Sequence, residues 1–564
     1  MDRVRVARAV GTELARLGVG TVFGVVGSGN FHVTNALVAA SARFVAARHE
    51  GGAATMADAY ARVSGEVGVL SVHQGPGLTN ALTGITEAAK SRTPLLVLAA
   101  DVGAAAVRSN FRVDQAALAR AVGAVPERLQ SPASALADLR RAHRTAVADR
   151  RTVLLSLPLD VQAAEIADPA AFPEPEPPPP STPSAPSPPS APPVPAQQVI
   201  ARLADALAAA GRPVFIAGRG ARLAAAREPL RALAERTGAL LATSAVARGL
   251  FRGDPFDLDV SGGFASPLAA ELIRGADLIV GWGCALNMWT LRHGTLVAPE
   301  TTVVQVDLDG AALGAHRPID LGVVGDVAGT ARSVEAELSR RGWSAAGYRS
   351  PELAGRLAGE VRWRDVPYED DGDGERIDPR TLSLALDDLL PAERTVAVDS
   401  GNFMGYPAMY LDVPDADGLV FTQAFQSIGL GLATAIGAAF ARPDRLTVAA
   451  LGDGGALMGV SELETAVRLG LGMVIVVYDD EAYGAEVHHF GPDGYPLDTV
   501  TFPPADIAEI GRGFGCAAVT VRQAADLAAV SRWLTGPRDR PLLVHAKVTA
   551  SRPAWWLEEA FRGH

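Results

Sequence analysis

Short apolar runs rich in β-branched residues alternate with longer Ala-, Leu- and Arg-rich stretches along the whole chain. Such apolar runs are typical of strands buried on both faces of a parallel sheet, and apolar positions three and four residues apart predict amphipathic helices. Strands and helices alternating over this length predict an α/β fold of doubly wound parallel sheets. In such sheets, ligands bind at the carboxyl ends of the strands.

The expected strands form three groups along the chain. They lie in 20–26, 65–73 and 93–100, in 212–218, 276–283 and 301–309, and in 394–401, 445–455, 472–480 and 540–548. Glu50 to Ser64 and Ser461 to Leu469 are expected helices. Each group therefore predicts one sheet with its covering helices.

Two segments separate these groups. Residues 173–195 hold 13 of the 39 prolines, so they predict an extended surface connector. Residues 348–379 include an acidic, Gly-bearing stretch without periodicity. We expect a first domain in 1–172, a Pro-rich linker in 173–196, a central domain in 197–347, a linker in 348–379 and a last domain in 380–564.

Composition excludes several classes of protein. Of the 564 residues, 48% are hydrophobic, which is too many for a disordered chain, and the net charge of −12 argues against a general nucleic-acid or anionic-membrane surface. Two cysteines cannot form a disulfide framework or a thiolate metal cluster. The charged N-terminal helix does not resemble a signal peptide, and no long apolar span occurs. We expect a cytoplasmic protein that binds neither nucleic acid nor membrane.

Two acidic residues follow neighbouring strands of the last group. Asp453 stands in Gly452-Asp453-Gly454-Gly455 directly after one strand, and Asp480 follows the next strand 27 residues later. Carboxylates at strand ends beside Gly-rich turns suit a magnesium ion bridging to a diphosphate, because glycines let backbone N–H groups approach phosphate oxygens. Either motif alone could be an Asp-containing turn of an α/β sheet.

This pair of motifs resembles the thiamine diphosphate motif of the decarboxylase and acetolactate synthase superfamily. The resemblance implies that Asp453, Asp480 and the backbone carbonyl of Ala482 bind the metal. The family usually has an Asn pair where this chain has Asp479 and Asp480, so the departure adds negative charge beside the diphosphate.

A second stretch, from Arg48 to Arg62, resembles the segment that carries the family's activating glutamate, here Glu50. The resemblance implies that Glu50 shares a proton with N1′ of the aminopyrimidine, which allows the cofactor's own imino group to deprotonate C2. Without the resemblance, Glu50 could simply complement the macrodipole of its helix.

Further matches extend the resemblance over nearly the whole chain. Phe23 to Ser28 resembles the strand and turn near the substrate. The segments 74–80, 399–402 and 427–431, together with the residues after Asp480, imply additional cofactor contacts. These contacts are Gly75, Asn80, Gly401, Asn402, Ile428, Gly452, Gly454, Gly455, Tyr483 and Gly484, and Ile428 props the cofactor in its bent conformation.

The family places the glutamate and the diphosphate site in different domains, so the resemblance implies a homodimer or homotetramer with Glu50 and Asp453 from different copies. In some relatives the central domain binds FAD or another nucleotide. Here only Gly218-Arg219-Gly220 resembles a nucleotide turn. A lone Gly-x-Gly is usually just a tight turn, so the sequence disfavours FAD but leaves a nucleotide in the central domain open.

Family chemistry implies a small 2-oxo acid substrate, a C2 ylid and an enamine. The enamine is protonated in a decarboxylase, whereas it attacks an aldehyde or keto acceptor in a carboligase. Ser28 and His73 stand where benzoylformate decarboxylase-like members hold a serine and a proton-transferring histidine, and Glu486 aligns with an acid of pyruvate decarboxylase-like members. Turn or surface roles remain open for all three.

Phe111 occupies the position of a glutamine in acetolactate synthase-like members, which weighs against the carboligase. The change at Asp480 and the loss of that glutamine also leave open a catalytically silent, cofactor-binding paralogue that acts as a scaffold or regulator. A dinucleotide-dependent oxidoreductase would rest on Gly218 and Gly220 alone.

Overall fold

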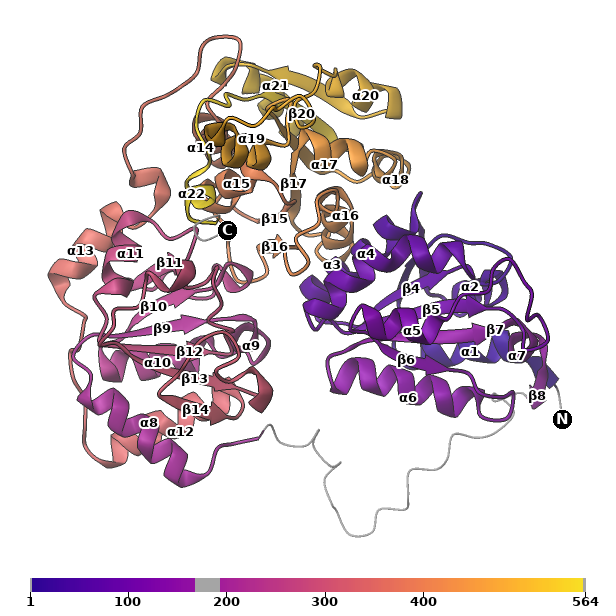
Figure 1. The fold of residues 1–564 in the computed structure, drawn as a ribbon, viewed down its shortest axis with the longest axis horizontal. Helices are drawn as coiled ribbons and strands as arrows, with labels where there is room; N and C mark the ends of the chain where they lie inside the picture. The colour runs from indigo at the N-terminus through magenta and orange to yellow at the C-terminus, as the bar shows by residue number, and fades with distance from the viewer. Residues whose placement is uncertain (1–2, 168–192, 561–564) are drawn as a thin grey trace.

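The computed structural model describes residues 3–167 and 193–560. Three six-stranded parallel sheets, each covered by helices, form three α/β domains (Figure 1). The predicted fold class is therefore confirmed. Residues 168–192, which include most of the expected Pro-rich linker (173–196), lie outside the described residues.

The first domain has the strand order β3-β2-β4-β5-β7-β6. One buried cluster joins this sheet to α1, α2 and α6, and a second cluster lies under α3, α4 and α5 on the opposite face. The strands are β2 (Thr21–Gly24), β3 (Arg43–Ala46), β4 (Gly68–Val72), β5 (Leu95–Asp101), β6 (Val125–Arg128) and β7 (Thr152–Pro158), with a small antiparallel pair β1 (Arg3–Arg5) and β8 (Glu165–Ala167). The helices are α1 (Val6–Arg16), α2 (Phe31–Ala39), α3 (Glu50–Ser64), α4 (Pro76–Lys90), α5 (Gln115–Ala121), α6 (Ala135–Ala148) and α7 (Leu159–Ala163).

The central domain has the strand order β11-β10-β9-β12-β13-β14. Its strands are β9 (Pro213–Ala217), β10 (Leu240–Thr243), β11 (Asp257–Val260), β12 (Leu278–Trp282), β13 (Thr302–Asp307) and β14 (Leu321–Val324). Its helices are α8 (Gln197–Ala209), α9 (Arg219–Leu223), α10 (Arg227–Thr237), α11 (Pro267–Arg274), α12 (Val327–Arg340) and α13 (Pro351–Glu360). Helix α13 forms inside the segment expected as the second linker, because Leu353 and Leu357 share a helix face and are buried in the central core.

The last domain has the strand order β16-β15-β17-β18-β20-β19. Its strands are β15 (Arg394–Val398), β16 (Leu419–Phe421), β17 (Leu446–Gly452), β18 (Val474–Asp479), β19 (Ala517–Val521) and β20 (Leu542–Lys547). Its helices are α14 (Pro379–Leu389), α15 (Gly405–Tyr410), α16 (Gly431–Ala441), α17 (Asp453–Met458), α18 (Glu462–Arg468), α19 (Gly484–Phe490), α20 (Ile507–Phe514), α21 (Ala528–Leu534) and α22 (Trp555–Ala560).

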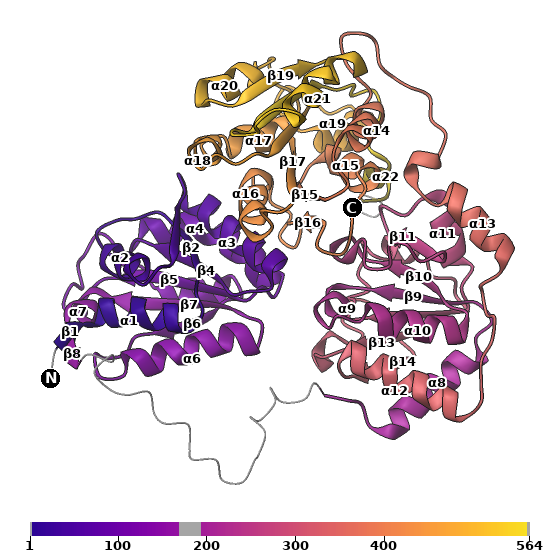
Figure 2. The same cartoon turned by 180° about the vertical axis from the view of Figure 1, so that it is seen from behind.

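The last domain contacts both of the others. Helices α3 and α16 pack together, and their buried side chains belong to one hydrophobic cluster shared by the first and last domains (Figures 1 and 2). Within the described residues, no helix has the length and apolar character that crossing a bilayer would require.

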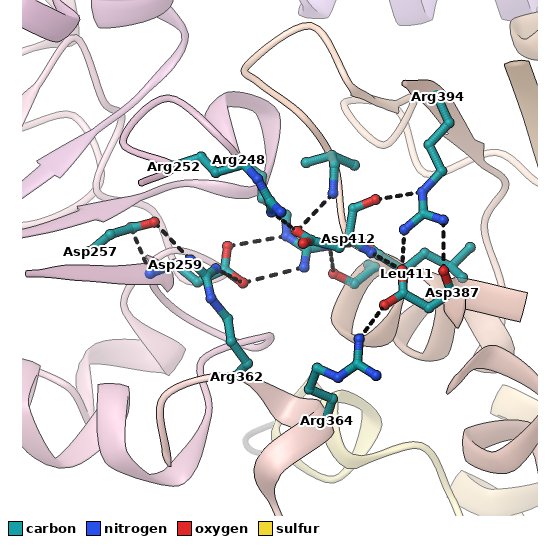
Figure 3. A network of polar contacts seen from close by, with 12 residues as sticks. Arg248, Arg252, Asp257, Asp259, Arg362, Arg364, Asp387, Arg394, Leu411 and Asp412 are labelled. Carbon is teal, nitrogen blue, oxygen red and sulfur yellow. Dashed lines mark hydrogen bonds and ion pairs between the residues drawn. The ribbon is translucent and has the colours of Figure 1, made fainter. Parts of the chain in front are cut away.

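A buried network of ion pairs joins the central domain to the last one (Figure 3). Arg248 donates to the main-chain oxygens of Ala408 (2.6 Å) and Leu411 (2.9 Å), and its Nε lies 3.1 Å from an Asp259 oxygen. Burial alone would raise the pKa of Asp259, but Arg248 and then Arg362 outweigh it and lower that pKa. Because these buried charges are paired, the network fixes the arrangement of the two domains.

Candidate active site

Two carboxylates stand at the ends of neighbouring strands in the last domain. Strands β17 and β18 are parallel with Gly452 opposite Tyr478, so Asp453 and Asp480 reach the same edge of the sheet. Both line a cavity of about 2170 Å³. Burial, reinforced by the charge of Asp480, raises the pKa of Asp453 to about 8, and burial raises the pKa of Asp480 to about 7.

A hard divalent cation fits this pair, because it would offset both the burial and the mutual repulsion. Among the described residues, no cluster of three or more His, Cys, Asp or Glu side chains is arranged to hold a metal. The cation would therefore need further oxygen ligands from the backbone or from a bound diphosphate. The Ala482 residue also lines the cavity, and its main-chain carbonyl is a ligand of that kind.

Glycines around the two acids allow close approaches. A Cβ on Gly484 would lie 2.3 Å from Asp480 Oδ2, and one on Gly454 would lie 2.6 Å from the Tyr483 ring. A Cβ on Gly455 would lie 2.3 Å from Asp399 Oδ2. Any larger residue at these three positions would displace the acids and the ring, so the glycines maintain the shape of this wall.

The segment that carries Ile428 is held by the buried carboxylate of Asp399. The backbone N–H groups of Gly429 and Leu430 donate to it at 3.0 and 3.2 Å. Burial raises the pKa of Asp399 to about 6, although these hydrogen bonds oppose the rise. Ile428 itself lines the cavity.

The C-terminal segment closes one side of the cavity. Asn402 Oδ1 accepts a hydrogen bond from the Ala554 N–H (3.1 Å), and its main-chain oxygen accepts one from Trp556 Nε1 (2.9 Å). Trp556 is buried and lines the cavity together with Asn402 and Gly401. The aromatic chain end is thus part of the candidate site, a contact that only the tertiary fold creates.

In the first domain, Glu50 is the first residue of α3. Asn80 Nδ2 donates to Glu50 Oε2 at 3.1 Å. The N–H groups of Arg48 and His49 donate to Glu462 of α18 at 3.1 and 3.0 Å, so the last domain fixes the turn before Glu50. The structure therefore brings together the predicted Glu50 and Asn80.

His73 lies near Glu50. Its Nδ1 accepts the Gly29 N–H at 3.1 Å, which leaves the proton of the neutral ring on Nε2. Burial lowers the pKa of His73, and the charge of Glu50 opposes the shift only in part. The Phe111 ring packs edge-on against the imidazole at 5.3 Å. Ser28 is exposed in the turn that contains Gly29.

The predicted site residues fall into two separate groups. Those of the last domain line the large cavity, and those of the first domain are not among its described lining residues. The first group comprises Gly401, Asn402, Ile428, Gly452, Asp453, Gly454, Gly455, Asp480, Ala482, Tyr483, Gly484 and Glu486; the second comprises Ser28, Glu50, His73, Gly75 and Asn80. Within the described residues, the cavity that Asp453 lines does not include Glu50.

A buried ion pair that sequence reasoning missed connects the two domains. Arg62 Nη2 lies 2.7 Å from both Glu87 Oε1 and Asp58 Oδ2. The N–H groups of Ala424 and Phe425 donate to Glu87 at 3.1 and 2.7 Å. The sequence did contain a signal for this ion pair, namely charged residues on the otherwise apolar faces of α3 and α4. Such residues are buried only when they are paired.

The Gly218-Arg219-Gly220 turn lies in another part of the same cavity. The Gly218 N–H donates to the main-chain oxygen of Trp282, and the Gly220 N–H donates to that of Gly283, both at 2.9 Å. Both glycine N–H groups are thus used within the chain.

Comparison with known proteins identifies all three domains. Residues 4–119 match the N-terminal thiamine pyrophosphate binding domain of thiamine pyrophosphate enzymes, residues 200–334 match the central domain, and residues 399–546 match the C-terminal thiamine pyrophosphate binding domain.

Several curated relatives match nearly the whole chain. A probable 2-ketoarginine decarboxylase of Pseudomonas aeruginosa is 31% identical, over 92% of this chain and 89% of its own length. The large subunit of acetolactate synthase from Parasynechococcus marenigrum is 27% identical over 91% and 83%. A sulfoacetaldehyde acetyltransferase of Alcaligenes xylosoxydans xylosoxydans is 29% identical over 83% and 80%.

Proposed function

Because the chain belongs to the family of thiamine pyrophosphate (thiamine diphosphate) enzymes, we propose that it is a magnesium-dependent 2-oxo acid decarboxylase or carboligase. Its relatives are lyases and transferases that use this cofactor, and this chain is an enzyme of the same type. The finer assignment rests on its own residues.

The pairing of Asp453 with Asp480 is the observation that carries the proposal. One buried and one half-buried carboxylate, Asp453 and Asp480, have raised pKa values and lie beside glycines at adjacent strand ends, where they would hold Mg²⁺ next to a diphosphate. Asn402, which lines the same wall, would contact the phosphate end, and Ile428 would support the bent cofactor.

When bound, thiamine diphosphate supplies a nucleophilic carbon and an electron sink for the 2-oxo acid. Glu50 would hold a proton at N1′ of the pyrimidine, and the hydrogen bond from Asn80 would orient its carboxylate. His73, neutral and with its proton on Nε2, would donate to the oxygen of the reacting carbonyl. Ser28 and Glu486 are the other candidate proton donors.

We also propose that a second copy of the chain completes the site. Since Glu50 and Asp453 do not share a cavity within one chain, the glutamate that acts at each diphosphate site would come from the partner. Large apolar side chains are exposed on both domains, including Phe31 and Phe111 in the first and Met458 in the last. A homodimer is then the smallest working unit, and a homotetramer would contain two such pairs.

A substrate panel tests the reaction. The purified protein with thiamine diphosphate and Mg²⁺ should release CO₂ from at least one of pyruvate, benzoylformate and longer 2-oxo acids, and product analysis for aldehyde and acetolactate separates decarboxylase from carboligase. Glu50→Gln should lower kcat by orders of magnitude while the cofactor still raises Tm. Cofactor binding without turnover of any substrate would instead favour the silent paralogue.

Complementation tests the shared site. Glu50→Gln and Asp453→Ala proteins should each be inactive. When the two are mixed under conditions that exchange subunits, heterodimers should regain activity, because one of their two sites has both residues intact. Absence of recovery, with subunit exchange shown by differently tagged chains, would contradict a site built from two copies.

A further inference from the structure

The side-chain amide of Gln423 is buried and unpaired. Among the residues that the structure describes, neither its Oε1 nor its Nε2 has a hydrogen-bond partner, although both atoms are inaccessible to solvent. Gln423 lines the same cavity as the Asp453 and Asp480 carboxylates. Leaving a buried donor and acceptor without partners costs free energy, and folded proteins rarely tolerate it without a reason.

Aromatic side chains lie close to Gln423 along the chain. The Phe421 ring, two residues earlier, packs edge-on against Phe264 of the central domain, with centroids 5.6 Å apart, and both rings line the cavity. These two rings contribute apolar surface to the cavity wall. In such an environment a hydrogen bond from a ligand to the amide is stronger than one exposed to water.

The backbone on both sides of Gln423 is fixed. The Thr422 hydroxyl lies 3.3 Å from that of Thr434 inside the last domain. On the other side, the N–H groups of Ala424 and Phe425 donate to Glu87 of the first domain. With the residues before and after it anchored, Gln423 is held against the cavity, and its lack of partners does not come from a loose loop.

Five residues further along the chain, Ile428 lines the cavity beside the carboxylate wall. The segment 422–428 therefore runs from the proposed cofactor site toward the wall that faces the central domain. Gln423 stands at the end remote from Ile428. A molecule that reacts near Ile428 and extends along this segment would bring its far end to Gln423.

We propose that Gln423 is a specificity-determining residue, which recognises an uncharged polar group, a hydroxyl or a carboxamide, at the far end of the 2-oxo acid substrate. The inference rests on the proposed function. The chemistry of the amide selects the group, because Nε2 needs an acceptor and Oε1 needs a donor. A carboxylate leaves Oε1 unpaired and a guanidinium leaves Nε2 unpaired, whereas a hydroxyl or a carboxamide can pair with both.

Matched substrates test this assignment. Phenylpyruvate and 4-hydroxyphenylpyruvate differ by one hydroxyl, and 5-methyl-2-oxohexanoate and 2-oxoglutaramate differ by a carboxamide in place of an isopropyl group. The wild-type enzyme should prefer the polar member of at least one pair. Gln423→Met, which keeps the length of the side chain, should lower the ratio of kcat/KM for polar over apolar substrate by about tenfold to a hundredfold.

Gln426 provides the matched control. It lines the same cavity from the same loop, but it is exposed and has no buried, unpaired amide atom. Gln426→Met should leave the substrate ratio within about twofold of wild type. Gln423→Glu is the second variant if Gln423→Met folds poorly. It keeps the length and the acceptor but loses the donor, so it should also lose discrimination within the preferred pair.

The outcomes separate this inference from the proposed function. If wild type consumes no 2-oxo acid with cofactor and Mg²⁺ present, the proposed function fails, and this inference fails with it. If wild type is active but shows no polar preference, or if Gln423→Met changes kcat/KM equally for both members of the preferred pair, only the role of Gln423 is overturned. The affinity for thiamine diphosphate, titrated by fluorescence, should be the same in all variants.

Discussion

Lys547 Nζ lies 2.6 Å from Asp479 Oδ2, where strands β20 and β18 end side by side. His545 Nε2 lies 2.6 Å from the same oxygen. Burial would raise the pKa of Asp479, but His545 and Lys547 outweigh it and lower that pKa. Of the two adjacent acids, only Asp480 lines the cavity. Lys547, a cation of the same chain, therefore balances the charge of the acid that precedes Asp480.

Removing this cation should destabilise the protein. Lys547→Met leaves the buried Asp479 without its cationic lysine partner, with His545 and the Glu481 N–H still bonded to it, and we expect a loss of about 3 kcal/mol in the free energy of unfolding. Urea titration followed by circular dichroism measures it. Asp479→Asn in the same chain should recover most of the loss, and a double variant no more stable than Lys547→Met would contradict the pairing.

Asp480→Asn should preserve the proposed metal site. An asparagine oxygen remains a ligand for Mg²⁺, and the repulsion with Asp453 disappears. The affinity for thiamine diphosphate with Mg²⁺, followed by thermal shift, should stay within about tenfold of wild type, which corresponds to about 1.4 kcal/mol.

The matched variant is Asp453→Ala, which should abolish the thermal shift by cofactor and Mg²⁺. Excess EDTA should do the same to wild type. A cofactor-dependent shift that persists in EDTA would show that the diphosphate binds without a divalent cation.

His73 predicts a particular pH dependence. Because its pKa is lowered, the native ring stays neutral at a pH where the unfolded chain already binds a proton. The contribution of His73 to the free energy of unfolding is therefore fully present above the pKa of histidine in the unfolded chain. It is lost as the pH falls through the lowered pKa of the native ring. His73→Gln should remove that part of the acid destabilisation and lower kcat about a hundredfold at neutral pH.

The acid limb of kcat/KM provides the check on His73. Its midpoint should lie below about 6.5, the unperturbed value for histidine. A midpoint above that value in wild type, or an unchanged kcat in His73→Gln, would exclude the ring as the neutral proton donor.

We expect Glu87 of the first domain to affect substrate binding in the last domain. Glu87→Gln leaves the buried Arg62 with fewer charges to pair and places an amide NH₂ group near the N–H groups of Ala424 and Phe425. We expect a loss of about 3 kcal/mol in stability and a raised KM, because segment 422–428 loses its anchor. Equilibrium unfolding and steady-state kinetics measure the two effects.

The matched control for Glu87 is Glu66, which is exposed and lies outside this network. Glu66→Gln should change KM by less than about twofold. If Glu87→Gln alters stability alone, with KM and substrate preference unchanged, the ion pair is purely structural.

The sequence predicted the helices and strands whose bounds depend on neighbouring residues in the chain. Helix α3 spans Glu50–Ser64 as expected, since helical periodicity and the Gly65 that ends it are both visible in the sequence. Strands β17 and β18 were evident from their apolar runs, and two parallel strands necessarily end at one edge, which brings Asp453 and Asp480 together.

The remaining contacts depend on how domains meet. Nothing near Glu87 in the sequence specifies that it accepts hydrogen bonds from residues more than 330 positions away. The partnership between Trp556 and Asn402 likewise spans two distant segments, and the helix α13 was hidden because its apolar positions are few. The unpaired amide of Gln423 is visible only when every possible neighbour has been placed.

The docking of Trp556 on Asn402 has a practical consequence for handling the protein. A variant truncated before Trp556 would lose the indole that lines the cavity and its hydrogen bond to Asn402. Digestion by a carboxypeptidase that reaches this tryptophan would open the same wall. Shortened forms of the protein should therefore retain Trp556.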